Sequence, residues 1–138
     1  EIEAYFNKEK FNEEPKKNKK RLKKHLIIKD NFFKRLEKIK NNKNLVFVLH
    51  YPPFGVFDII KDKNNPMNNE SAGIKFFTEA MRKYKPRLVL CGHMHEYRGM
   101  KKLRGIPVIN PGDAEKGRAA IITLPENKME KIKVKFIK

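Results

Sequence analysis

Two uninterrupted apolar runs, residues 45–49 and 88–91, constrain the fold of this 138-residue chain more than any other feature. Neither run alternates apolar with polar residues, so each is predicted to be a strand buried on both faces. Apolar residues at helical spacing between them predict a helix over about residues 74–84, with Asn69 or Ser71 as its cap. This order predicts an α/β layer in which a right-handed crossover joins two parallel strands.

The pattern changes in the last third of the chain. Residues 106–112 are predicted to be a short strand that ends in a turn, and residues 119–124 are predicted to be another strand. Residues 132–136 alternate apolar residues with lysines, so this strand is expected to expose one face to water. Helix-linked buried strands followed by short successive strands predict two packed sheets, with helices covering at least one of them, in an α/β fold.

The N-terminal segment, residues 1–44, is basic and polar, and we separate it from the domain at residues 45–138. Its basic run, residues 16–24, is predicted to be a solvated helix or loop, because no aromatic residues lie among the lysines to stack nucleic acid bases. An amphipathic helix is predicted at about residues 30–40, with Asp30 as its N-cap.

Composition limits the function classes. Lys and Arg total 33 against 16 Asp and Glu, a net charge of +17 that attracts phosphate-bearing ligands but also occurs on surfaces that only need to be soluble. The chain has no apolar run of membrane-spanning length and no charged segment followed by an apolar one at its start, so we expect a cytoplasmic protein without membrane contact. Cys91 is the only cysteine, which excludes an internal disulfide, and we expect it to pack as a small hydrophobe.

Three of the four histidines follow the two buried strands directly. His50 ends the first run and precedes two prolines, while His93 and His95 follow Gly92 at the end of the second. Loops at the carboxyl ends of such strands are where ligands bind, and neutral imidazole is a good ligand for transition metals. Gly92 is expected to let the backbone turn sharply at the site. The sequence therefore predicts a metal site here, whereas His25 is predicted to be a surface or packing residue.

Three motifs together resemble a known family. Residues 50–54 (His-Tyr-Pro-Pro-Phe), 91–96 (Cys-Gly-His-Met-His-Glu) and 110–112 (Asn-Pro-Gly) are similar, in order and spacing, to the C-terminal half of calcineurin-like metallophosphoesterases. The likeness covers roughly residues 45–138 and is closest to small prokaryotic predicted phosphoesterases. It implies a four-layer αββα sandwich with a two-metal site at one edge, where phosphomonoesters or phosphodiesters are hydrolysed.

The resemblance also implies roles for individual residues. By the family's pattern His50 and His93 bind the second metal and His95 binds the first, with two divalent ions drawn from manganese, iron, zinc or nickel. Glu96 and Asn110 are expected to orient the histidine rings through hydrogen bonds, although ordinary turn chemistry explains them equally well.

The aspartate motifs that complete such a site are not found. The family's N-terminal half carries D-x-H, G-D-x-x-D and G-N-H, and none of these occurs in the sequence. Gly112-Asp113 is followed by Ala-Glu-Lys and fails the second pattern. The catalytic residues are therefore unknown and are expected in an N-terminal half supplied by a preceding segment or by a second chain. We expect the 138-residue chain alone to be inactive, and insoluble or partly unfolded, since an incomplete sheet exposes apolar surface.

Two alternatives remain open at this point. A basic nucleic-acid-binding module with incidental histidines would bind in a salt-sensitive way that does not depend on His50 or His93. A catalytically inactive scaffold would keep the metallophosphoesterase fold but lack the aspartates in its other half. The phosphoester hydrolase is the leading prediction because three separate motifs support it.

Overall fold

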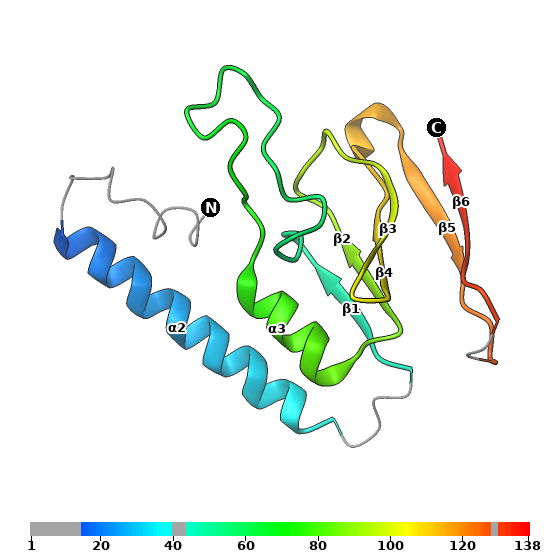
Figure 1. The fold of residues 1–138 in the computed structure, drawn as a ribbon, viewed down its shortest axis with the longest axis horizontal. Helices are drawn as coiled ribbons and strands as arrows, with labels where there is room; N and C mark the ends of the chain where they lie inside the picture. The colour runs from blue at the N-terminus through cyan, green and yellow to red at the C-terminus, as the bar shows by residue number, and fades with distance from the viewer. Residues whose placement is uncertain (1–14, 40–43, 128–129) are drawn as a thin grey trace.

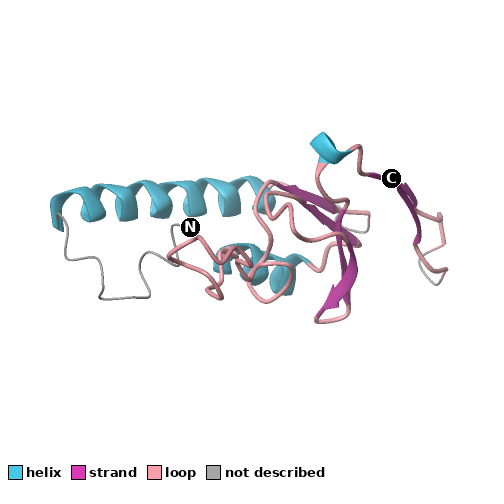
Figure 2. Cartoon of the chain, turned by 90° about the horizontal axis from the view of Figure 1, so that it is seen from above, coloured by secondary structure: helices cyan, strands magenta, loops and turns pink. Residues whose placement is uncertain are grey.

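The computed structural model describes residues 15–39, 44–127 and 130–138. The described elements follow in the order α2 (Pro15–Glu37), β1 (Val46–Leu49), α3 (Lys75–Tyr84), β2 (Leu88–Cys91), β3 (Gly99–Leu103), β4 (Ile106–Asn110), η1 (Ala114–Lys116), β5 (Ala119–Thr123) and β6 (Lys133–Ile137). Helices α2 and α3 lie on one side of the larger sheet, and the β5–β6 hairpin lies on the other (Figures 1 and 2).

The larger sheet has four strands in the order β1-β2-β4-β3. β1 pairs parallel with β2, β2 pairs parallel with β4, and β3 is antiparallel to β4. β5 and β6 form a separate antiparallel sheet. The predicted α/β class, the parallel strand–helix–strand unit and the two sheets are thus confirmed, with a helical layer, a mixed sheet and a second sheet in succession.

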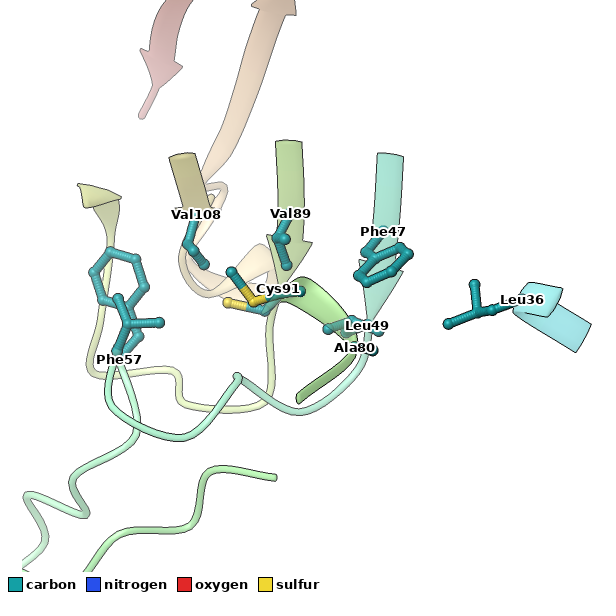
Figure 3. Close-up of a cluster of buried hydrophobic side chains, with 10 residues drawn as sticks. Leu36, Phe47, Leu49, Phe57, Ala80, Val89, Cys91 and Val108 are labelled. Carbon is teal, nitrogen blue, oxygen red and sulfur yellow. The ribbon is translucent and has the colours of Figure 1, made fainter. Parts of the chain in front are cut away.

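Alternate residues of the parallel strands build the core on the helix-facing side of the sheet (Figure 3). Phe47 and Leu49 from β1 meet Val89 and Cys91 from β2 there, because these residues are register partners and share one face. Leu36 of α2 and residues of α3 complete the same cluster. Cys91 is 4% exposed, so the prediction that it packs as a small hydrophobe is confirmed.

The other face of β1 differs from the prediction. Leu88 and Val89 of β2 are almost fully buried, but Val48 of β1 is 76% exposed. β1 is an edge strand of the four-stranded sheet, and no strand in the described part of the chain pairs with its outer side. The prediction of burial on both faces was therefore wrong for β1. An apolar run shows that a strand favours burial, but it does not show whether another element packs on each face.

The helix predicted at residues 30–40 begins much earlier, at Pro15. Proline fits the first helical position, and the straight-chain lysines and arginines that follow are good helix formers, so Asp30 lies inside the helix and is not its cap. The basic residues from Lys19 to Lys24 are exposed, which confirms the solvated helix. His25 is buried with its ring centroid 5.4 Å from that of Phe76, so its prediction as a packing residue is confirmed.

The predicted cap of α3 was wrong. The residue that precedes the helix is Ile74, which makes no side-chain cap, while the Ser71 hydroxyl donates to the buried carboxylate of Asp58. The helix ends as predicted before Pro86, with Lys85 in the left-handed region at φ 45° and its N–H bonded to Met81 O.

β3 was not predicted from the sequence. Its residues, Gly-Met-Lys-Lys-Leu, show neither an apolar run nor strict alternation, and antiparallel pairing with β4 through the Arg104-Gly105 turn makes it a strand. Of the helices in the described residues, none has the length and apolar character that crossing a membrane requires.

Candidate metal centre

The three predicted ligands lie at one edge of the four-stranded sheet. His50 follows β1, and His93 and His95 follow β2, the neighbouring parallel strand whose last residue, Cys91, is the register partner of Leu49. The pairing continues one step past the strands, since the Gly92 N–H donates to the His50 carbonyl at 3.1 Å. The register of the sheet therefore fixes the position of the two chain segments that carry the candidate ligands.

His50 and His93 form a direct pair. Nε2 of His50 lies 3.1 Å from Nδ1 of His93, and the ring centroids are 5.0 Å apart. When two nitrogens occupy adjacent coordination positions on the same ion, each roughly 2.0–2.1 Å from it, the two nitrogens lie about 3 Å from each other. The 3.1 Å separation is compatible with both nitrogens binding the same ion, and without an ion the two rings share a hydrogen bond.

The backbone turn at the site is made by His93 and not by Gly92. His93 has φ 62°, in the left-handed region that a non-glycine residue rarely adopts, whereas Gly92 does not have a positive φ. A Cβ at position 92 would meet the His50 carbonyl oxygen at 3.8 Å, an ordinary contact. The predicted role of Gly92 was therefore wrong, and the backbone strain at the strand end is at His93, a candidate ligand.

Tyr51 packs against the pair. Its ring centroid lies 4.0 Å from that of His93 at an interplanar angle of 44°, and 5.0 Å from that of His50. The ring restricts the rotation of both imidazoles. Tyr51 was not predicted as a site residue, although an aromatic residue directly after a candidate ligand is a signal that the sequence contains.

His95 is separate from this pair. Its side chain is 62% exposed, and its Nδ1 lies 3.7 Å from Oδ1 of Asp113. Among the residues that the structure describes, no group of three or more His, Cys, Asp and Glu side chains is arranged to hold a metal. The structure thus brings two of the three predicted ligands together and places the third beside a carboxylate.

Asp113 was missed as a site residue by the sequence analysis, which considered it only as a failed G-D-x-x-D motif. Its side chain is 6% exposed and binds Lys116 Nζ at 3.1 Å, while Oδ1 accepts the Glu115 N–H at 3.1 Å. The hydrogen bond from Lys116 lowers the pKa of Asp113 below its ordinary value, with smaller contributions from the Glu115 N–H and the His95 charge. At 3.7 Å from Nδ1 of His95, the Asp113 carboxylate is beyond hydrogen-bond distance and acts on that ring through its charge.

Asn110 stabilises the backbone between the histidines. The side chain is 1% exposed, its Nδ2 donates to the Met94 carbonyl at 3.2 Å, and its Oδ1 accepts the Gly112 N–H at 2.9 Å. Met94 itself is 5% exposed. Asn110 therefore acts on the loop that carries His93 and His95, through its backbone and not through an imidazole ring.

Glu96 has a different partner from the one expected. Its Oε1 accepts the Lys61 N–H at 3.2 Å, and the neighbouring Tyr97 hydroxyl donates to the Ile59 carbonyl at 2.8 Å. Both bonds join the histidine loop to the long loop after β1. Glu96 consequently positions one wall of the site.

Cys91 lies directly before the loop. Burial raises the pKa of its thiol to about 12, so the sulfur is neutral over the physiological range. The Cys91 side chain belongs to the buried hydrophobic cluster that includes Phe47, Leu49 and Val89.

The strand order and the helices on one face of the sheet define the chain as part of an α/β protein, with two imidazoles paired at one edge of the sheet. Residues 7–134 match the family described as metallophosphoesterase, calcineurin superfamily. The chain belongs to this family, whose members generally use divalent metals. The match begins before residue 45 and includes all of α2.

Similar proteins are longer than this chain. Uncharacterized protein MJ1162 of Methanocaldococcus jannaschii is 33% identical over 73 residues, which are 53% of this chain and 33% of that protein. One crystal structure superposes with a TM-score of 0.53 at 24% identity, covering 77% of this chain and 37% of the other, and thus shares the fold. A crystal structure of TT1561 of Thermus thermophilus gives a TM-score of 0.41 at 19% identity over 86% and 40% of the two chains. The chain spans between a third and two fifths of the length of these relatives.

Proposed function

We propose that the complete protein hydrolyses phosphomonoesters or phosphodiesters at a two-metal site to which this chain contributes histidine ligands. The observation that carries the proposal is the 3.1 Å approach of His50 Nε2 and His93 Nδ1 at a strand edge, in a chain of the metallophosphoesterase family. No catalytic acid or base is assigned in this chain.

Each residue has a role in the proposal. His50 and His93 hold one divalent ion, and His95, oriented by Asp113, contributes to the other. Two such ions polarise phosphoryl oxygens and lower the pKa of a bound water. Tyr51 and Asn110 keep the histidines in place, and Glu96 holds the wall formed by the loop after β1. In this proposal the two ions are manganese, iron, zinc or nickel. The protein acts in the cytoplasm.

The remaining ligands belong to another part of the protein in this proposal. Two or three histidines without bridging carboxylates bind metal weakly, and the chain spans only 33% of MJ1162 and 37% of the matched crystal structure. An N-terminal half, in the same or in another chain, supplies the carboxylates and the catalytic group. By itself the 138-residue chain is inactive.

The test is hydrolysis of an aryl phosphodiester by the complete protein carrying His93→Ala or His95→Ala. Each change is expected to lower kcat/KM by at least about 100-fold, the order lost when a group that stabilises transition-state charge is removed. Circular dichroism should stay unchanged, because both side chains lie at the surface edge of the sheet.

His25→Phe is the matched control. It also removes an imidazole, but from the packing contact between α2 and Phe76, and it should leave kcat/KM within about twofold of wild type. Unchanged turnover in His93→Ala or in His95→Ala would contradict the assignment of these histidines to the metal site.

A further inference from the structure

A second candidate site lies beside α3, outside the histidine edge. A cavity of about 310 Å³ opens to solvent between α3, the segment after β1 and the β3–β4 turn. Its lining residues are Phe54, Lys75, Thr78, Glu79, Arg82 and Arg104.

The lining is strongly basic. Lys75, Arg82 and Arg104 contribute three positive charges, and the one carboxylate, Glu79, is paired with Lys29 of α2 at 2.8 Å. The net positive charge of the lining therefore favours binding of an anion, since a concave surface lined by one sign of charge concentrates ions of the other sign.

The two arginines have unused hydrogen-bonding capacity. Arg82 and Arg104 make no hydrogen bond or ion pair with any residue in the part of the chain that the structure describes. Other basic residues are engaged: Lys83 binds Glu37 at 3.4 Å, and Arg98 donates to the Ile137 carbonyl at 2.8 Å. A guanidinium group presents its donors in a planar fork that matches phosphate oxygens, so two such groups at one cavity fit a phosphate group.

The walls of the cavity are held by the fold. The Thr78 hydroxyl donates to the Phe54 carbonyl at 2.9 Å, which ties the segment after β1 to α3. Arg104 is held in the β3–β4 turn at φ 52°, between the paired residues Leu103 and Ile106. The Phe54 ring is 41% exposed, with Lys75 Nζ 5.6 Å from its centroid. A ligand thus meets positioned cations and one aromatic surface.

We infer that this cavity binds the phosphate group of a ligand through Arg82 and Arg104, at a site separate from the histidines. None of the histidines is among the residues that line the cavity. The inference does not depend on hydrolysis. Anion binding at Arg82 and Arg104 tests it, independently of the role of the histidines.

Calorimetric titration of the complete protein with inorganic phosphate and with adenosine 5′-monophosphate tests the inference. Arg82→Gln and Arg104→Gln are each expected to weaken binding of both probes by about 10-fold or more, because each removes charge-assisted hydrogen bonds. Arg82→Lys keeps the charge but not the fork and should give a smaller loss. Amide shifts of Thr78 and Glu79 should accompany binding in ¹⁵N NMR spectra.

Lys102→Gln is the matched control, because it removes one exposed charge from the same β3–β4 hairpin without touching the cavity lining. Its affinity should stay within about twofold of wild type. Equal weakening by all three Gln variants would indicate diffuse charge attraction and overturn the inference. Phosphate binding that the arginine variants leave unchanged, or no binding to the complete protein, would overturn it as well.

The two probes also distinguish the source of the phosphate. Tighter binding of the nucleotide, with the gain lost in Phe54→Leu, would identify a nucleotide whose base packs on the exposed ring. Equal affinity for both probes would identify the inorganic anion as sufficient. Either result, with the loss in the arginine variants, supports the site.

Discussion

Individual side chains at the sheet edge are held by contacts that differ in kind. The His50 and His93 rings meet through nitrogen atoms 3.1 Å apart and are flanked by Tyr51, whereas His95 meets the carboxylate of Asp113. Left-handed backbone at His93 adds a conformational cost that the surrounding hydrogen bonds must offset. Such strain is typical of residues that a functional site holds in a fixed orientation.

The Cys91 thiol gives a prediction at this scale. Its pKa is raised to about 12 because burial disfavours the thiolate, so the folded protein should react with a disulfide reagent at pH 8 far more slowly than the unfolded protein does. The unfolded thiol ionises above pH ~9. Stability should therefore fall as the pH rises from that value toward the folded pKa, and Cys91→Ala should show a shallower fall in chemical unfolding. Fast labelling of the native protein would contradict the packing of Cys91.

Residue-level prediction from the sequence worked best where a residue type and its position at a strand end coincide. Cys91 packs as predicted, and His50 and His93 lie together at the predicted edge. Asp113 and Tyr51 were not assigned to the site, because their contacts with His95 and His93 depend on turn geometry and ring packing, which a one-dimensional motif does not contain.

Secondary structure elements place these residues, and one glycine controls how the elements meet. A Cβ at Gly73, which precedes α3, would lie 2.6 Å from Phe54 Cα and 2.8 Å from Oδ2 of Asp58. Both neighbours are fixed, since the Gly55 N–H and the Ser71 hydroxyl bind the same carboxylate. The close approach therefore needs glycine at this position.

Gly73→Ala is expected to lower the free energy of unfolding by about 1–3 kcal/mol through this overlap. Gly92→Ala is the matched control, because its Cβ would make only a 3.8 Å contact with the His50 carbonyl oxygen and its φ is not positive. It should cost less than about 1 kcal/mol. Chemical unfolding of both variants measures the difference, and equal costs would contradict the packing around Gly73.

The sequence predicted elements well where one signal was strong. β1, β2, β4, β5 and β6 lie within a residue or so of their predicted positions. The start of α2 was missed because lysines conceal the amphipathic pattern, and β3 was missed because pairing with β4 outweighs its weak strand character.

At the scale of the whole molecule, β1 exposes one large apolar side chain at the edge of the four-stranded sheet. Val48 is 76% exposed on β1, and no strand in the described part of the chain pairs with the outer side of β1, so its backbone groups there can pair with another strand. Composition and motifs predicted that surface only in general terms, since no sequence pattern within the chain states what covers it.

Val48→Lys is expected to act in opposite directions on the chain alone and on the complete protein. In the 138-residue chain a lysine on the edge strand should reduce self-association in light scattering, because edge charges oppose strand pairing between copies. In the complete protein it should lower thermal stability if this face is covered. Thr123→Lys, an exposed position on β5, should change neither property. Self-association that Val48→Lys leaves unchanged would show that this surface is not responsible.

The most direct test of the account is the divalent metal content of the complete protein, by elemental analysis, before and after His50→Ala. About two ions are expected per wild-type chain and about one in the variant, because His50 and His93 share one of the two ions in the proposed site. Metal content that His50→Ala leaves unchanged would contradict it.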